Sequence, residues 1–216
     1  MPFIDIIPDT DINADVRAMY DRQQAFWGFV PNYARVFCYR PEIMGLWAQL
    51  QAGIKKHMDK RRFELITFAA AHTLRSTLCS LAHGRALTAF FSMEDIQLMA
   101  RGASPASLSA AEAAMMAFAR KVARGPFATV RGDVTELKKH GFTDAEVFDI
   151  AATAAARAFW TGVVESLGVE PEPSLLELEP EFKRTLACGR PINGSAPPAN
   201  GPLQADAPRA PSRGNG

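Results

Sequence analysis

The sequence predicts an all-α fold from three observations. Alternating runs of β-branched and aromatic residues, which signal strands, are almost absent after the first seven residues. Apolar residues instead recur at steps of three and four. Ser or Thr followed three residues later by Glu begins two apolar segments, which is the signature of a capped helix.

Helices are expected, in chain order, over residues 13–26, 41–57, 60–75, 79–91, 109–124, 131–140 and 143–168. The helix at 60–75 follows Asp59, a residue type suited to the N-cap position. One apolar stripe runs along this helix, formed by Phe63, Ile66, Ala70 and Leu74. Such a stripe is typical of a helix that packs one face against a core.

Two later helices begin with a predicted capping box. Ser109 and Glu112 form the first, just before an apolar run. Thr143 and Glu146 form the second, and Gly168 is expected to end the helix that follows.

The chain divides into one helical domain, residues 1–188, and a tail, residues 189–216. The 216 residues are 48% hydrophobic, which is enough for one buried core. The tail holds six prolines, five glycines and no aromatic residue. It can bury little apolar area to offset chain entropy, so we expect it to be disordered and dispensable for chemistry.

Composition also restricts the class of partner and the compartment. A net charge of +1 gives no reason to expect nucleic acid. The N-terminus shows no signal peptide, and the longest apolar run, 150–164, is too short for a membrane span and is interrupted by Arg157. A cytoplasmic protein is therefore expected. Three scattered cysteines indicate thiols and no disulfide framework.

The stretch "STLCSLAHG", residues 76–84, places a cysteine beside a histidine. If Ser76 caps the helix, Cys79 is its third residue, near free backbone N–H groups and the positive end of the helix dipole. This position favours thiolate, the nucleophilic form. His83, four residues on, lies on the same face and could take up and return the thiol proton.

Two other interpretations of this stretch remain open. Cysteine is among the commonest buried residues, and a histidine on an apolar helix is usually a hydrogen-bonded core residue. A zinc site from His72, Cys79 and His83 is weaker, because no clustered second pair of ligands exists. For that reason no metal is expected. No glycine-rich phosphate loop is present either, so a bound flavin or nicotinamide is not expected.

The segment "RRFELITFAAAHTLRSTLCSLAHG", residues 61–84, resembles the core motif of AhpD-like alkylhydroperoxidases in the carboxymuconolactone decarboxylase superfamily. Glu64, Cys79 and His83 fall on the glutamate, the second cysteine of a C-x-x-C pair and the following histidine. The flanks "GFVPNYARVFCYRPEIM" and "GFTDAEVFDIAATAAARAF" resemble the peroxidase-related branch, so the likeness covers about residues 27–172. It implies an AhpD-like helical domain, an obligate homo-oligomer (trimer, hexamer or dimer) and thiol-dependent reduction of hydroperoxides.

The motif departs from the family at two positions. Ser76 replaces the first cysteine of the pair, and Leu78 replaces a histidine often found before the second. Ser76 can hydrogen-bond a thiolate but cannot form a disulfide with it. A sulfenic acid on Cys79 must therefore react with an external thiol, a second subunit, or the distant Cys38 or Cys188.

In the family the glutamate belongs to a proton relay with the histidine, which raises a question of geometry. In a helical hairpin that turns near Thr77, Glu64 and His83 would be offset by about 10 Å at 1.5 Å rise per residue. Oblique helices, a bridging water or a second subunit could close this gap. Glu64 could also pair with Arg157, a cation with no acid three or four residues away.

The leading interpretation is a cytoplasmic thiol peroxidase that uses Cys79, His83, Glu64 and Ser76. Its partners would be a small-molecule hydroperoxide, an external thiol reductant and further copies of the chain, without nucleic acid or membrane. Two alternatives are a non-redox, decarboxylase-like proton-transfer enzyme that uses the histidine and glutamate, and a non-catalytic redox sensor or scaffold.

Overall fold

The computed structural model describes residues 2–192, and all the regular secondary structure in that range is helical. The prediction of an all-α fold is therefore confirmed. The helices are α1 Ala14–Trp27, α2 Asn32–Val36, η1 Phe37–Tyr39, α3 Pro41–Lys55, α4 Lys60–Thr73, α5 Thr77–Leu87, α6 Met93–Ala100, α7 Ala110–Arg124, η2 Pro126–Ala128, α8 Arg131–Lys139, α9 Asp144–Ser166, α10 Pro173–Leu176 and α11 Pro180–Leu186.

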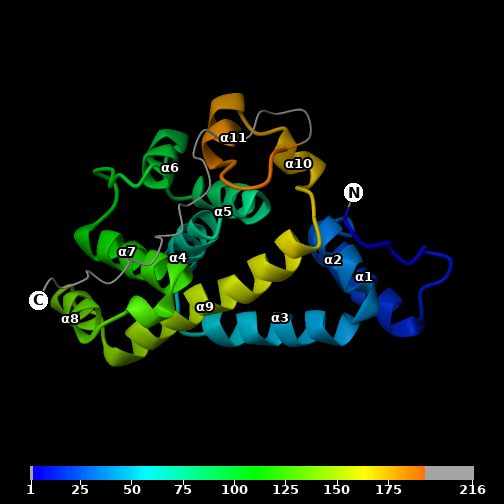
Figure 1. Cartoon of the computed structure of the whole chain (residues 1–216), viewed down its shortest axis with the longest axis horizontal. Helices are drawn as coiled ribbons and strands as arrows, with labels where there is room; N and C mark the ends of the chain where they lie inside the picture. The colour runs from blue at the N-terminus through cyan, green and yellow to red at the C-terminus, as the bar shows by residue number, and fades with distance from the viewer. Residues whose placement is uncertain (1, 193–216) are drawn as a thin grey trace, which may run out of the picture.

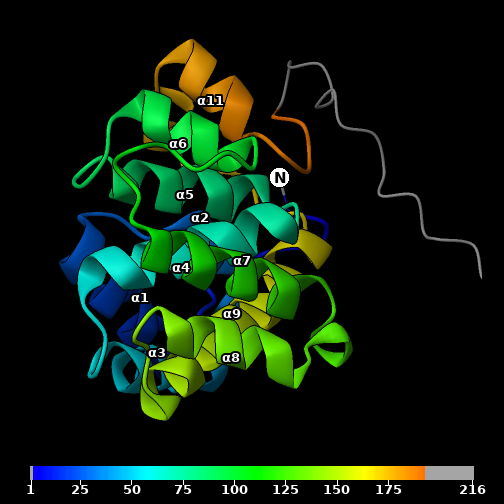
Figure 2. The same cartoon turned by 90° about the vertical axis from the view of Figure 1, so that its left-hand side faces the viewer.

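The helices are arranged around α4, which packs against α5, α7 and α9. Figure 1 shows α3 and α9 side by side along the lower edge of the molecule, with α5, α10 and α11 above them. The perpendicular view agrees, since α11 and α6 lie over α5, while α3, α8 and α9 lie below α4 (Figure 2). The central helix α4 is consequently buried on most sides, from Phe63 to Ala71.

The structure has N-caps at the residues that the sequence predicts. Asp59 caps α4 by accepting a hydrogen bond from the backbone N–H of Arg62 at 2.9 Å. Both predicted capping boxes are formed, at the starts of α7 and α9. Gly168 lies just beyond α9 with a φ of 67°, a left-handed conformation that glycine adopts at little cost.

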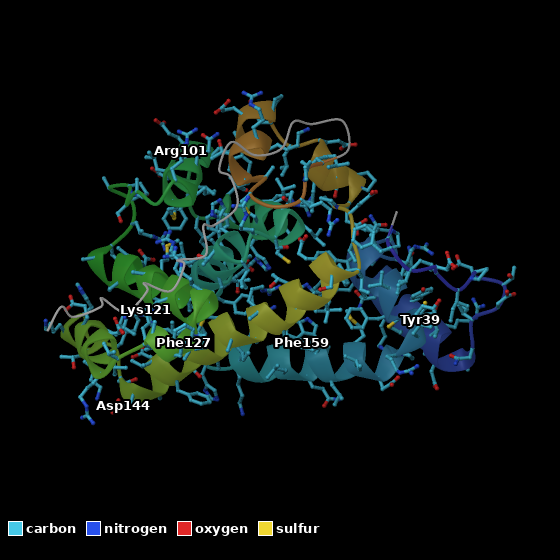
Figure 3. The ribbon with its side chains drawn as sticks, in the orientation of Figure 1. Tyr39, Arg101, Lys121, Phe127, Asp144 and Phe159 are labelled. Carbon is cyan, nitrogen blue, oxygen red and sulfur yellow. The ribbon has the colours of Figure 1, made fainter. Side chains whose placement is uncertain are left out.

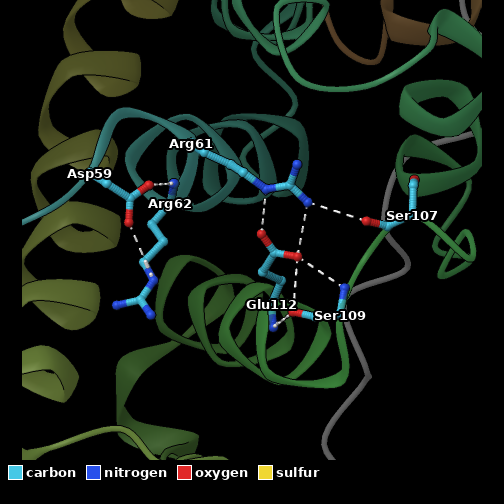
Figure 4. Close-up of polar contacts among 6 residues, drawn as sticks. All are labelled: Asp59, Arg61, Arg62, Ser107, Ser109 and Glu112. Atoms are coloured by element: carbon cyan, nitrogen blue, oxygen red, sulfur yellow. Dashed lines mark hydrogen bonds and ion pairs between the residues drawn. The ribbon is translucent and has the colours of Figure 1, made fainter.

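Two arginines connect the start of α4 to these capping boxes. Arg61 donates two hydrogen bonds to the Glu112 carboxylate, at 2.6 and 3.1 Å, and a third to the backbone carbonyl of Ser107 (Figure 4). Glu112 at the same time accepts a hydrogen bond from the backbone N–H of Ser109 at 2.9 Å. A two-pronged arginine–carboxylate pair has a well-defined geometry, so it fixes α4 relative to α7.

Arg62 makes the equivalent connection to α9. Its guanidinium binds the capping-box glutamate Glu146 at 2.8 Å and also lies 3.4 Å from Asp59 (Figure 4 shows the Asp59 contact). The residues directly before the buried part of α4 thus hold it against two neighbours. Glu64, two residues further along, is positioned by these contacts.

The short helices α2, α6, α10 and α11 were not among the predicted elements, because few residues give too little apolar periodicity. The last of them packs on the predicted cysteine helix. Gly84 of α5 lies against Leu186 of α11, whose side chain a Cβ at this position would overlap. Close packing between α5 and α11 therefore requires the glycine.

Residues 189–192, the first four of the predicted tail, are the only tail residues that the structure describes; the rest of the predicted disordered tail lies outside the described residues. Within them, the backbone N–H of Gly189 donates to Thr77 Oγ1 at 3.0 Å. Thr77 Oγ1 in turn donates to the Arg190 carbonyl at 2.8 Å. These contacts attach the segment to the first turn of α5.

In the described range, α9 is the one helix long and apolar enough to cross a membrane by length and composition. Half of that apolar window is buried inside the protein, against α3, α4 and α7. The same properties are those of a core helix.

His72, near the end of α4, makes stability depend on pH. Burial, with the charge of Arg120, lowers its pKa from 6.5 to about 4. The unfolded chain takes up a proton below pH 6.5 that the folded chain does not, so stability is lost as the pH falls towards 4. Acidification from pH 7 to 4.5 lowers the free energy of unfolding. We expect this loss to be about 2–3 kcal/mol smaller in His72→Gln than in the wild type, measured by urea unfolding. His57→Gln, at an exposed site, is the control, and equal acid sensitivity in all three proteins would contradict the prediction.

Candidate active site

The cysteine motif lies at the start of α5, as its sequence indicates. Ser76 is the N-cap, and its hydroxyl accepts a hydrogen bond from the backbone N–H of Cys79 at 3.3 Å. The same hydroxyl donates to Glu165 of α9 at 2.6 Å. Cys79 is accordingly the third residue of the helix, and its position is held by contacts between α5 and α9.

Cys79 is only 3% exposed, but it faces a cavity of about 380 Å³. His83, Glu64 and Arg157 line the same cavity. The four residues come from three helices, α5, α4 and α9. The thiol therefore has open space beside it, and that space is shared with an acid, a base and a cation.

His83 and Glu64 are in direct contact within one chain. His83 Nδ1 lies 2.7 Å from Glu64 Oε2, and their side chains are 18% and 10% exposed. The offset of about 10 Å that a hairpin would give does not occur, because α4 ends at Thr73 and Arg75 turns the chain with a φ of 57°, so the two helices do not form a hairpin centred on Thr77. Of the three ways to close the gap, the one within a single chain, in which the helices cross, is the one observed. No bridging water or second subunit is needed for this contact.

The charges in the cavity set the proton positions on this pair. Burial lowers the pKa of His83, and the nearby guanidinium of Arg157 lowers it further. Burial raises the pKa of Glu64, but the hydrogen bond from His83 and the charges around it outweigh this effect, so the net direction is down. Because a carboxylate only accepts, Nδ1 of a neutral His83 carries the proton, and Nε2 is left as a proton acceptor.

Arg157 has a position that the sequence analysis did not predict. It is 5% exposed, and its guanidinium carbon lies 5.6 Å from the ring centre of Trp47. Among the described residues its Nε has no hydrogen-bond partner, and no ion pair joins it to Glu64. Its charge and a hydrogen bond instead lower the pKa of Cys79. The alternative of a direct Glu64–Arg157 pair is thus replaced by a cation that faces the thiol.

The expectation that the helix start favours thiolate is wrong for the resting protein. Burial raises the pKa of Cys79, and this outweighs the opposing effects of Arg157 and the Ser76 hydroxyl. Desolvation penalises the anion more than the few favourable dipoles recover. The thiol is protonated at neutral pH and needs a base to become nucleophilic.

The other two cysteines lie away from this cavity. Cys38 is buried in η1, near Tyr20 of α1. Cys188 follows α11 and lies near Ser80, and burial raises its pKa to about 12. Neither lines the cavity that Cys79 faces. In the described part of the chain no three or more His, Cys, Asp or Glu side chains are grouped as metal ligands.

The aromatic walls of the cavity were also not predicted. All three tryptophans of the chain line it, and the rings of Trp47 and Trp160 stack with centres 4.8 Å apart. Lys55 of α3 and Glu172 line it as well. These residues are far from the motif in sequence. The signal that could have indicated them is that tryptophan, rare in this chain, occurs in segments that flank the motif on both sides.

Comparison with known proteins agrees with the motif. Residues 41–121 match the Carboxymuconolactone decarboxylase family. An AhpD-core, peroxidase-related protein of Ralstonia eutropha is 22% identical, with a TM-score of 0.71 over 88% of this chain and 98% of that one. A peroxidase-related protein of Silicibacter sp. is 20% identical, with a TM-score of 0.69 over 82% and 94%. The family match agrees with the predicted resemblance over residues 41–121, and the two structures share the helical fold of this chain.

A third similar structure has a different described activity. The C82A variant of the debrominase Bmp8, in complex with 2,3,4-tribromopyrrole, is 15% identical, with a TM-score of 0.68 over 83% of this chain and 97% of that one. At these identities the likeness establishes the fold alone. No curated protein sequence matches the chain.

The raised pKa of Cys79 leads to a prediction about its reactivity. In a Cys38→Ser, Cys188→Ser background, we expect the iodoacetamide rate to rise about tenfold per pH unit up to pH 8 and to be still rising at pH 9, because the pKa of Cys79 is raised and thiolate remains scarce. Arg157→Met should lower the rate at pH 8 by about tenfold or more, since the guanidinium favours the anion. Mass spectrometry follows the alkylation, and circular dichroism checks that the variant is folded. A rate that levels off below pH 8 would contradict the prediction.

Proposed function

From the match of residues 41–121 to the carboxymuconolactone decarboxylase family, we propose that this chain is a thiol-dependent peroxidase that reduces hydroperoxides with a single nucleophilic cysteine, Cys79. One observation carries the proposal. Cys79 faces the same cavity as a neutral, carboxylate-bound imidazole and a buried guanidinium. A nucleophile, a proton acceptor and a cation are the groups that this reaction needs.

The first step oxidises the cysteine and cleaves the peroxide. His83 Nε2 takes the thiol proton as the sulfur attacks the terminal peroxide oxygen, which forms the S–O bond and breaks the O–O bond. The leaving alkoxide receives the proton from His83. In sum, thiol and hydroperoxide give sulfenic acid and alcohol, so sulfur is oxidised and the peroxide is reduced.

Glu64 and Arg157 assist this step electrostatically. Glu64 holds the proton on Nδ1 of His83 and stabilises the imidazolium that forms briefly. Arg157 stabilises the negative charge that develops first on sulfur and then on the leaving oxygen. Because the guanidinium is already buried and in place, no reorganisation is needed during the reaction.

The second step returns the cysteine to its thiol form with an external reductant. A small thiol attacks the sulfenic acid on Cys79 to give a mixed disulfide and water. A second thiol then releases the free cysteine and a disulfide of the reductant. Ser76, whose hydroxyl accepts from the backbone N–H of Cys79 and donates to Glu165, takes no part in electron transfer.

A second function is supported by a separate observation, namely that the His83–Glu64 contact at 2.7 Å involves no sulfur. A neutral imidazole bound to a carboxylate can serve as a general base by itself. A proton-transfer enzyme of the decarboxylase type would use this pair on a carbon acid bound in the cavity. Cys79 would then only line its wall.

We also propose a homo-oligomer in the cytoplasm. Large apolar side chains are exposed on α3 and α9, which lie side by side (Figure 1; Phe159 is labelled in Figure 3). They are Ile43, Leu46, Leu50, Phe148 and Phe159. The three on α3 are spaced by three and four residues and share one face. Exposed apolar faces of this kind are typical of subunit interfaces.

The oligomer can be tested at this face. Leu46→Glu is expected to shift the assembly towards the monomer, because a charge on an apolar interface is poorly solvated. Light scattering coupled to size-exclusion chromatography measures the mass. Lys56→Glu, at an exposed position after α3, is the control. A wild-type monomer at micromolar concentration would exclude this part of the proposal.

The peroxidase proposal is tested by removing each thiol. Cys79→Ser is expected to abolish peroxide consumption with dithiothreitol as reductant, a loss of about 10³-fold or more, because the hydroxyl is a far weaker nucleophile. Cys38→Ser and Cys188→Ser should keep activity within about twofold, since neither lines the cavity. The ferrous–xylenol orange assay measures the remaining hydroperoxide.

The same variants separate the two functions. Full activity in Cys79→Ser would end the peroxidase proposal. Turnover of a carbon acid that persists after alkylation of Cys79, and is lost in His83→Gln, would favour the proton-transfer function instead.

A further inference from the structure

The cavity beside Cys79 is much larger than hydrogen peroxide requires. A water molecule occupies about 30 Å³ of liquid volume, whereas the cavity measures about 380 Å³. A ligand with a body about the size of a substituted aromatic ring would fill it. The volume alone thus indicates an organic hydroperoxide in preference to hydrogen peroxide.

The walls of the cavity are suited to a ring. Trp47 and Trp160 stack with their ring planes 15° apart, and Tyr33 meets Trp160 edge-on at 5.2 Å. Trp27 and Phe63 add further aromatic surface. Such walls bind flat apolar groups by dispersion and ring contacts.

The charges on the cavity wall favour an anion on the same ligand. Both acids that line it already accept hydrogen bonds, Glu64 from His83 and Glu172 from the backbone N–H of Asn32 at 2.5 Å. Three of the cations have no carboxylate partner among the described residues, and one of them, Arg85, donates to the Ser174 hydroxyl at 3.2 Å. Arg157 is 5% exposed with an unpartnered Nε, and Lys55 has its ammonium 4.5 Å from the ring centre of Phe63, with no ion pair.

Arg157 and Lys55 have different roles. Arg157 is buried with the thiol, so it faces the reacting oxygens. Lys55, at the end of α3, is an exposed residue that also lines the cavity, and its ammonium lies against the ring of Phe63. An ammonium at the mouth is a point charge on a flexible stem that can reach a carboxylate.

On the basis of the proposed peroxidase function, we propose that the substrate is an organic hydroperoxide with an aromatic or similarly flat apolar body and a carboxylate, which Lys55 binds at the mouth of the cavity. The body lies against the stacked tryptophans. The hydroperoxide group then lies at the inner end, beside Cys79 and Arg157. The reaction remains the one above, with a thiol oxidised to a sulfenic acid and the hydroperoxide reduced to its alcohol.

A matched pair of substrates tests the charge. Cumene hydroperoxide and its para-carboxylate differ only in the carboxylate. In the wild type we expect kcat/KM to be about tenfold higher for the carboxylate, which corresponds to about 1.4 kcal/mol. Lys55→Met should reduce this ratio to about one, because it removes the charge that distinguishes the two substrates. Lys56→Met, which alters the neighbouring exposed lysine, should keep the tenfold ratio.

A binding measurement separates this inference from the peroxidase proposal. The two product alcohols are not oxidants, and their binding to the cavity can be followed by the fluorescence of the tryptophans that line it. If neither hydroperoxide is consumed but the carboxylate alcohol binds about tenfold more tightly, and Lys55→Met removes the difference, the ligand class stands and the peroxidase function fails. Equal kcat/KM and equal affinity within the matched pairs, or a preference that persists in Lys55→Met, would overturn the inference.

Discussion

The chemistry of this protein depends on one cation buried in an apolar helical domain. A guanidinium taken out of water is stable only where anions, hydrogen-bond acceptors or aromatic faces compensate for its lost hydration. Arg157 has Trp47 on one side and the Cys79 thiol on the other, and the Glu64 carboxylate acts on it through its charge without a hydrogen bond. Compensation is therefore incomplete while the cysteine is protonated, and it improves when the sulfur becomes an anion. The same burial that raises the pKa of the thiol thus creates a site in which thiolate is the missing partner of a fixed charge.

This site requires α4, α5 and α9 to be positioned accurately relative to one another. Contacts at the ends of these helices fix their positions. Arg61 and Arg62 bind the capping-box glutamates of α7 and α9, so the start of α4 is fixed two residues before Glu64. The cysteine helix is held in turn by Ser76, whose hydroxyl joins α5 to Glu165 of α9. The partly buried, two-pronged Arg61–Glu112 pair is stiffer than a single surface ion pair, which contributes little. Through these contacts with α9, which also carries Arg157, the acid, the base and the sulfur are held at fixed positions relative to one another.

Local signals in the sequence predicted these helix ends, but they could not predict contacts between residues that are distant in sequence. Asp59, Ser76 and both capping boxes cap the helices that they were expected to cap, because capping depends on residues within one turn. The sequence left the route of the contact between Glu64 and His83 open, because that contact depends on where α4 ends and how α5 crosses it. The predicted shift in the pKa of Cys79 had the wrong sign for a related reason. The burial that raises this pKa comes from packing against helices that are remote in sequence. The aromatic walls of the cavity and the orientation of Arg157 towards Cys79 depend on the packing of α3 against α9, which no local pattern encodes.

Ser76 is better understood as part of the structure than as a missing cysteine. Its oxygen accepts the backbone N–H of Cys79 and donates to Glu165, which are two hydrogen bonds that a thiol makes poorly. A cysteine at this position would weaken the cap of α5 and leave a half-buried carboxylate without its donor, and burial already raises the pKa of Glu165. The guanidinium of Arg190 lies 3.8 Å from the Glu165 carboxylate and donates a hydrogen bond to the Glu165 backbone carbonyl at 2.6 Å, so the cap, the last turn of α9 and the segment after α11 are connected. Position 76 is thus committed to holding the nucleophile in place, which is compatible with a cycle in which the reducing equivalents come from outside the helix.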